Sequence, residues 1–117
     1  MAKDDYHVIV YQILSYLYMQ LKKGAAVEAS YISNDSPYYR INERYWEYII
    51  RNLYQEGCID GICVKVQHYT DGQTETQIYG LEECQITPKG IEYLSDNSFM
   101  NKAKEFFKDV KSIVPFV

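Results

Sequence analysis

One stretch, residues 41–66, limits what this chain can fold into more than any other. Four apolar residues in it recur at the spacing of one face of an α-helix: Trp46, Ile49, Ile50 and Leu53. Asn42 is a suitable N-cap for this helix, with the acidic Glu43 in its first turn. Gly57 is placed to end it, because glycine accepts the left-handed conformation that is common at helix ends.

The residues that follow this helix, 58–66, have the composition of a turn and then a strand. We expect a hairpin with arms at about Ile62–Tyr69 and Thr76–Leu81, because Asp71-Gly72 between them is a strong hairpin-turn signal. A helix that leads directly into a hairpin is typical of the middle of a winged helix-turn-helix domain. The predicted fold class is therefore α+β, with a three-helix core, a β-hairpin wing and an extra C-terminal helix.

Two helices are expected before residue 41. The first spans about Asp4–Lys23, with acidic residues at its start, lysines at its end and Gly24 to stop it. Six of its residues share an apolar face: Tyr6, Val10, Ile13, Leu14, Leu17 and Leu21. The second helix is expected at Ala25–Ser33, and the turn formers at 34–37 then complete a helix-turn-helix unit.

The C-terminal part is expected to be helical. A short strand at 84–86 precedes Thr87-Pro88, an N-cap followed by proline at the first helical position. A break is expected at 95–98, where four small polar residues meet, and a helical extension begins at about residue 98. With 117 residues the chain has room for one hydrophobic core, so we expect a single domain over residues 1–117.

The composition excludes several classes of protein. No Cys-x-x-Cys pair occurs, and the two histidines are isolated, so we expect no metal site and no cofactor. No recognisable catalytic constellation is present, which argues against an enzyme, and no small-molecule ligand is evident. The longest apolar runs are too short to span a membrane, and the odd number of cysteines argues against a disulfide framework, so we expect a cytoplasmic protein. Cys63 is expected to be a small buried residue of a strand.

Several segments together resemble the YjcQ family, and the resemblance covers nearly the whole chain. They are residues 3–6, Leu21–Gly24, Tyr45-Trp46, the run Ile86–Leu94 and the run Met100–Phe106. Within them, Thr87-Pro88-Lys89-Gly90 recurs in many winged-helix proteins. The resemblance implies a winged-helix fold in a small protein of Gram-positive bacteria or their phages. It implies no catalytic residue, cofactor or established function, so no site residue is transferred from it.

A winged helix would place the helix after residue 41 in the major groove of DNA. The candidate DNA-binding residues on and before this helix are Arg40, Asn42, Arg44, Tyr45 and Arg51. Glu43 and Glu47 lie beside these arginines, so a solvated face of mutually paired charges is an alternative. On this basis we expect the chain to be a DNA-binding accessory protein or a transcriptional regulator.

A second function class is a protein-interaction module that keeps the winged-helix shape. The chain carries a net charge of -4, and residues 56–96 contain eight acids against two lysines. An acidic wing would repel a phosphate backbone. The 13 tyrosines suit half-buried and interface positions. A continuous basic face over the helix after residue 41 would favour DNA, and its absence would favour the interaction module.

The C-terminal segment suggests a homodimer. Its apolar stripe includes Phe99, Ala103, Phe106, Val110 and Ile113, widened by Phe107 and Val114. This stripe can close the core of one chain or form a seam between two. The candidate dimer residues are Tyr11, Tyr18, Phe99, Phe106 and Val110.

Overall fold

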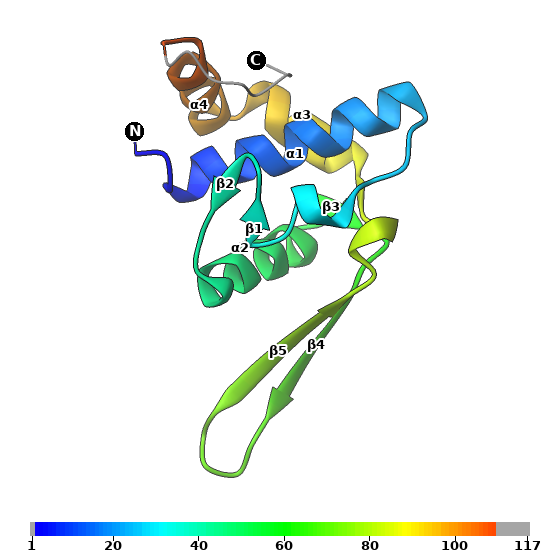
Figure 1. Ribbon diagram of the computed structural model, residues 1–117, viewed down its shortest axis with the longest axis vertical. Helices are drawn as coiled ribbons and strands as arrows, with labels where there is room; N and C mark the ends of the chain where they lie inside the picture. The colour runs from blue at the N-terminus through cyan, green and yellow to red at the C-terminus, as the bar shows by residue number, and fades with distance from the viewer. Residues whose placement is uncertain (1, 110–117) are drawn as a thin grey trace.

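The computed structural model describes residues 2–109 (Figure 1). Four α-helices are present: α1 (Tyr6–Lys23), α2 (Glu43–Gln55), α3 (Pro88–Asp96) and α4 (Ser98–Asp109). Six short strands form three antiparallel pairs: β1 (Asp35–Ser36) with β2 (Tyr39–Arg40), β3 (Ile59–Asp60) with β6 (Gln85–Ile86), and β4 (Cys63–His68) with β5 (Thr74–Tyr79). Two 3-10 turns, η1 (Ala29–Tyr31) and η2 (Leu81–Glu83), complete the described elements.

Helix α1 is the centre of the core. Its ten residues from Val8 to Leu17 are all buried, so neighbouring elements cover every side of the helix and not one stripe alone. Strand β6 and helices α3 and α4 pack against it (Figure 1). The buried Gln12 is held by a hydrogen bond from its Nε2 to the Tyr38 carbonyl at 3.0 Å. The prediction that Leu21 faces the core was wrong: it lies in the last turn, past the buried run, and is 46% exposed.

The predicted second helix at Ala25–Ser33 was also wrong, because only the 3-10 turn η1 forms there. Side chains of α1 and α2 form hydrogen bonds with backbone groups that would be paired with each other in a helix. Gln20 donates to the carbonyl of Ala26 at 2.6 Å, and the Glu28 amide donates to the Tyr16 hydroxyl at 2.9 Å. A nine-residue segment gains too little from its own hydrogen bonds to compete with such partners. The strict helix-turn-helix unit is therefore replaced by η1 and the β1–β2 hairpin.

The predictions for α2 are confirmed. The Asn42 side chain caps the helix by accepting from the Arg44 amide at 2.8 Å. Gly57 ends it with a φ of 78°, and the Cys58 amide then bonds back to the Leu53 carbonyl at 2.9 Å. The expected apolar face is buried, and Trp46 donates from Nε1 to the Ile32 carbonyl at 2.7 Å. This bond attaches α2 to the segment that follows α1.

The wing is the β4–β5 hairpin, which extends away from the helices (Figure 1). Its turn contains Asp71-Gly72 as predicted, and Gly72 has a φ of 86°. The prediction that Cys63 is buried was wrong: it is exposed, because it belongs to this projecting hairpin and not to the core. Glu82 and Glu83, which follow the second arm, lie in η2 and are exposed.

The short β3–β6 pair joins the base of the wing to α3. Ile59 lies opposite Ile86, and both side chains are buried. Thr87 caps α3 by accepting from the Gly90 amide at 3.0 Å, with Pro88 in the first turn, as predicted. Gly90 must be glycine here, because a Cβ would collide with the Cys58 carbonyl. Helix α3 thus packs closely on the end of α2.

The expected break before the C-terminal helix is confirmed. Helix α3 ends at Asp96, and the Asn97 side chain accepts from the amides of Phe99 and Met100 at 2.9 and 3.3 Å, which caps α4. The buried face of α4 consists of Met100, Ala103 and Phe107. Ala103 and Phe107 of the predicted stripe are therefore buried, whereas Phe99 is exposed and Met100, which was not predicted, is buried in its place. The members of the stripe from Val110 onward lie outside the described residues.

This arrangement is α+β and is compatible with a winged-helix-like fold. Helix α2 takes the place of the recognition helix, β4–β5 that of the wing, and α3 follows the wing.

Replacing Trp46 tests the attachment of α2. Trp46→Ala should lower the free energy of unfolding by about 3–5 kcal/mol, because a large buried side chain and its hydrogen bond are both lost. Trp46→Phe should cost less, about 1–3 kcal/mol, mainly through the unpaired Ile32 carbonyl. Urea unfolding measures both. Tyr48→Ala is the control, because Tyr48 is 51% exposed and lies on the opposite face of α2. Equal losses of stability in Tyr48→Ala and Trp46→Ala would contradict this packing.

Thiol reactivity tests the placement of the three cysteines. In the folded protein only the exposed Cys63 should react rapidly with Ellman's reagent. Cys58 and Cys84 are buried; burial raises the pKa of Cys58, and burial together with the Asp60 carboxylate raises the pKa of Cys84 to about 12. Denaturant should expose all three thiols. Cys63→Ser should abolish the rapid phase, and a second rapid thiol in the native protein would show that β3 or β6 is placed wrongly.

Candidate functional site

A groove of about 400 Å³ lies between the exposed side of α2 and strand β5 of the wing. Helix α2 contributes Glu43, Arg44, Glu47, Tyr48 and Arg51, and the wing contributes Thr74, Glu75 and Thr76. The helix residues share one face because they recur at helical spacing, opposite to the face that carries Trp46. The groove is where a winged-helix protein that binds DNA would bring its recognition helix and its wing together.

The groove has more acidic than basic groups: three carboxylates and two guanidinium groups line it. Burial raises the pKa of the half-buried Glu47, and the neighbouring Glu43 and Glu75 raise it further. Arg44 and Arg51 oppose this shift without cancelling it. Within residues 2–109, no ion pair joins a groove arginine to a groove carboxylate. The side chains therefore do not neutralise each other in pairs, unlike the self-paired face considered from the sequence.

Aromatic side chains and the wing tip hold parts of the groove in place. The Arg51 guanidinium lies 5.7 Å from the centre of the Tyr48 ring, a cation–π contact that directs Arg51 along the helix. On the wing, the Tyr69 hydroxyl donates to Glu75 Oε2 at 2.6 Å across the hairpin. Glu75 is thus fixed next to α2, where its charge acts on Glu47.

The five candidate DNA-binding residues do not lie together in one site. Only Arg44 and Arg51 line the groove. The Asn42 side chain is used as the cap of α2, and the Tyr45 hydroxyl donates to the Asp4 carbonyl at 2.7 Å, which attaches α2 to the N-terminal segment. The sequence predicted the capping role of Asn42. It did not predict the role of Tyr45, because its hydrogen-bond partner lies 41 residues away along the chain.

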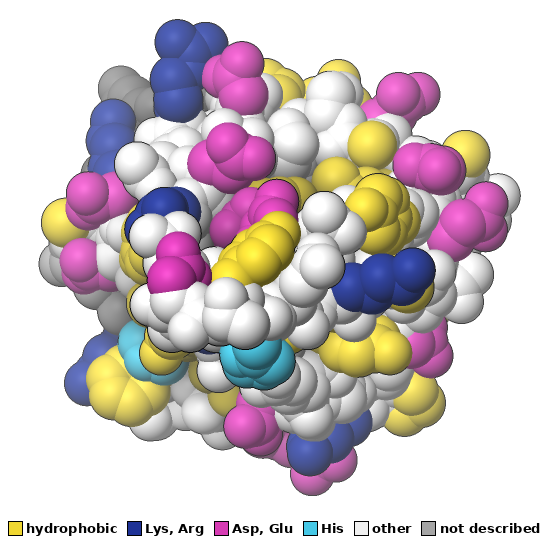
Figure 2. Space-filling view, turned by 90° about the horizontal axis from the view of Figure 1, so that it is seen from below, with side chains coloured by type: hydrophobic (Ala, Val, Ile, Leu, Met, Phe, Trp, Pro, Cys, Tyr) yellow, Lys and Arg dark blue, Asp and Glu magenta, His cyan; other side chains and the backbone are white. Residues whose placement is uncertain are grey.

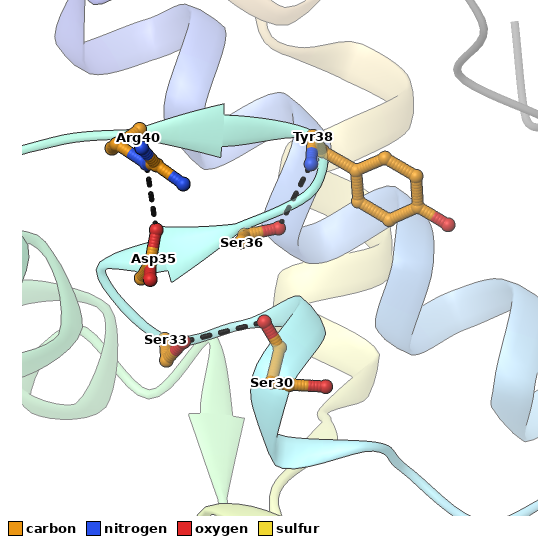
Figure 3. Close-up of polar contacts among 6 residues, drawn as sticks. All are labelled: Ser30, Ser33, Asp35, Ser36, Tyr38 and Arg40. Atoms are coloured by element: carbon orange, nitrogen blue, oxygen red, sulfur yellow. Dashed lines mark hydrogen bonds and ion pairs between the residues drawn. The ribbon is translucent and has the colours of Figure 1, made fainter.

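Arg40 lies in the β1–β2 hairpin and not on α2 (Figure 3). Its Nε forms an ion pair with Asp35 Oδ1 at 2.7 Å, directly across the hairpin. The Ser36 hydroxyl accepts from the Tyr38 amide at 3.1 Å and stabilises the turn, while the Ser33 hydroxyl donates to the Ser30 carbonyl at 3.2 Å. Arg40 therefore has an acidic partner of its own and is separate from the groove.

Sequence reasoning missed Tyr48, Thr74 and Thr76 as groove residues. Tyr48 was detectable, because it follows Arg44 by four residues and precedes Arg51 by three. The two threonines were not, since which wing strand faces α2 depends on the direction in which the hairpin leaves β3. The sequence drew attention to Glu43 and Glu47 beside the arginines and to the acidic character of the wing, and the structure brings these two glutamates together with Glu75 of the wing.

The face seen from the wing end carries acidic, basic and apolar side chains interspersed (Figure 2). No continuous basic surface is visible on this face among the described residues.

The candidate dimer residues are also separated. Tyr11 is buried and stacks on Phe107 of the same chain, with ring centres 5.7 Å apart, so it offers little surface to a second chain. Tyr18 and Phe106 are half-buried, Phe99 is exposed and stacks on His7, and Val110 lies outside the described residues. A homodimer stays a prediction, with Phe99 as its best exposed candidate.

Among residues 2–109, no group of three or more His, Cys, Asp or Glu side chains is arranged to hold a metal ion. None of the described helices combines the length and apolar character needed to cross a membrane.

The fold is α+β and compatible with a winged helix, and three carboxylates and two guanidinium groups line the groove between α2 and the β4–β5 hairpin. The family model described as YjcQ protein matches residues 11–113, which is most of the chain. The chain therefore belongs to the YjcQ family. Comparison with curated proteins found no match, and comparison with solved structures found none.

The raised pKa of Glu47 predicts how the free energy of unfolding depends on pH. Its pKa is higher in the folded than in the unfolded protein, so the folded state holds this proton more tightly. The stabilisation that the protonated Glu47 side chain provides is present below its pKa in the unfolded state, about 4.3. It is lost as the pH rises through the higher pKa of the folded state. Glu47→Gln should raise the free energy of unfolding at pH 7 and change it little at about pH 3.5, below both pKa values.

Urea unfolding at both pH values measures this difference. The matched control is Glu82→Gln, because Glu82 is exposed in η2 and lies outside the groove. A loss of stability for Glu47→Gln at pH 7 would show that the Glu47 carboxylate is stabilised by its neighbours and would contradict the electrostatics described above.

Proposed function

We propose that this protein is a protein-interaction module on a winged-helix-like scaffold, and that its partner presents a basic segment to the groove between α2 and the wing. The observation that carries the proposal is the placement of three carboxylates, on Glu43, Glu47 and Glu75, around one groove. Burial and, after it, repulsion by Glu43 and Glu75 raise the pKa of Glu47, and a lysine or arginine of a partner would offset both by stabilising the carboxylate. Electrostatic complementarity of this kind guides association and selects partners.

The same charges argue against the groove as a DNA surface. A protein gains most of its DNA affinity by neutralising phosphates with lysine and arginine. Here Arg44 and Arg51 face three carboxylates, and Arg40 is already paired with Asp35. The wing, β4–β5 with its turn, carries Lys65 against Asp71 and Glu75. A wing of this charge would repel the backbone that it must approach.

A DNA-binding accessory or regulatory function is the second candidate. It is supported by Arg44 and Arg51, which lie on the exposed side of α2 without a carboxylate partner among the described residues. Both are positioned where arginines of a recognition helix contact base edges or phosphates.

A cytoplasmic location accompanies either proposal. The three cysteines are free, and none is paired with another in the described structure. Free thiols, one of them exposed, suit a reducing compartment.

Fluorescence anisotropy with two labelled probes separates the two candidates. One probe is a mixed-sequence duplex of about 20 base pairs, and the other is a lysine- and arginine-rich peptide; both are measured at about 50 mM salt, where electrostatic binding is strong. The interaction module should bind the peptide and not the duplex. Glu47→Gln and Glu75→Gln should each weaken peptide binding about two- to fivefold, the range for partly exposed charge pairs.

The control variant is again Glu82→Gln, which should leave peptide binding unchanged because Glu82 is outside the groove. An equal effect of Glu82→Gln would mean that the peptide responds to net charge alone and would contradict the groove. Binding of the duplex that weakens in Arg44→Ala and Arg51→Ala, with a flatter salt dependence, would instead establish the DNA candidate.

A further inference from the structure

A second cleft lies between α1, α3 and α4. Helix α4 lies on the side of α1 away from the wing (Figure 1). The volume of the cleft is about 510 Å³. Pockets of roughly 300–1,000 Å³ are the size that holds small molecules. The groove beside the wing and this cleft share no residue, so the two can be tested independently.

The cleft exists because α3 is short. It ends at Asp96, and the Asn97 cap turns the chain into α4, so neither helix covers the C-terminal half of α1 completely. The last turn of α3 supplies Leu94 and Ser95 to one wall. Helix α4 supplies Asn101 and Lys104. One face of α1 forms the rest, through Tyr11, Ser15, Tyr18, Met19 and Lys22.

The floor of the cleft is polar, and its walls carry both polar and apolar side chains. Tyr11 and Ser15 are only 5% and 8% exposed, and their side chains are hydrogen-bonded to each other. Met19 and Leu94, both half-buried, provide apolar surface beside them. A thioether adapts its shape to different apolar groups, which suits a binding wall. A ligand here would bury an apolar body and could keep one polar group near the two hydroxyls.

Among the described residues, the charged side chains at this cleft are lysines. Lys22 and Lys104 line it, and no described carboxylate does, although the chain as a whole carries a net charge of -4. Lys104 forms no ion pair within residues 2–109, and the Lys22 ammonium lies 4.4 Å from the centre of the Tyr18 ring. Two ammonium groups at one cleft, on an otherwise acidic protein, attract an anion and repel a cation.

We propose that the cleft between α1, α3 and α4 binds a small organic anion, which places a carboxylate or phosphate group between Lys22 and Lys104 and an apolar body against Met19 and Leu94. Carboxylates and phosphates share the chemistry that ammonium groups recognise, because both accept charge-assisted hydrogen bonds. The apolar body distinguishes this ligand from a free inorganic ion.

The test uses three probes that share a naphthalene ring: 1-naphthylacetate, 1-naphthyl phosphate and the neutral 1-naphthaleneethanol. Each is titrated into the intact, isotope-labelled protein and followed by the amide shifts in ¹H–¹⁵N spectra. The two anions should produce saturable shifts at the amides of Leu94, Ser95 and Asn101, and their relative affinities decide between carboxylate and phosphate. The alcohol should bind at least about tenfold more weakly, since it lacks the charge. Inorganic phosphate at equal ionic strength should give no saturable shift, because it lacks the apolar body.

Lysine variants link the binding to this cleft. Lys22→Met and Lys104→Met keep an unbranched side chain of similar length and remove the charge, so each should weaken anion binding about three- to tenfold. Lys102→Met is the matched control, because Lys102 is also on α4 and exposed but does not line the cleft. It should bind as the unchanged protein does.

Three outcomes would overturn the proposal. The first is the absence of saturable shifts at the cleft with either anion up to about 10 mM, which is weaker than any specific affinity expected here. The second is equal binding of the alcohol and the anions, which would show a purely apolar contact. The third is an equal loss in Lys102→Met and Lys104→Met, which would show a response to overall charge.

Discussion

The enclosure of α1 is the constraint on which the rest of the structure depends. Ten consecutive residues of this helix are buried, so the other elements must surround it and cannot merely lie against one face. Such a helix has no hydrated side, and its polar members need partners inside the protein. Gln12 finds one in the Tyr38 carbonyl, and Tyr16 finds one in the Glu28 amide. These bonds fix where the connecting segment between α1 and α2 can lie.

The connecting segment shows how side chains can override local preference. Residues 25–33 contain good helix formers, yet Tyr16, Gln20 and Trp46 bind their backbone groups from outside. Trp46 joins α2 to this segment, and the segment in turn is held on α1. The arrangement stays compatible with a winged-helix-like fold, although a 3-10 turn forms where the sequence predicted the middle helix. Burial of α1 and attachment of α2 are two parts of one packing arrangement.

The groove and the cleft differ in charge. Three glutamates and two arginines of α2 and the wing line the groove, whereas the charged side chains at the cleft, among the described residues, are lysines of α1 and α4. The wing has little core of its own, since most residues of β4 and β5 are exposed and the hairpin makes its ladder bonds within itself. A two-stranded hairpin gains stability when another surface covers it. A partner at the groove would supply such a surface, which is consistent with the interaction proposed for it.

Local features of this protein were determined by the sequence alone. The limits of α1 and α2, the Asn42 and Thr87 caps, the Asp71-Gly72 turn and the break before α4 depend on neighbouring residues, so the pattern of side chains was sufficient to predict them. Tertiary structure decided what depends on distant partners: the loss of the second helix, the exposure of Cys63 and the burial of Tyr11. It also decided the candidate site. The arginines and glutamates of α2 become part of a groove only because the hairpin places Glu75 beside Glu47. The physical reason is that capping and turn energies act over a few residues, whereas burial and charge depend on which surfaces the whole chain brings together.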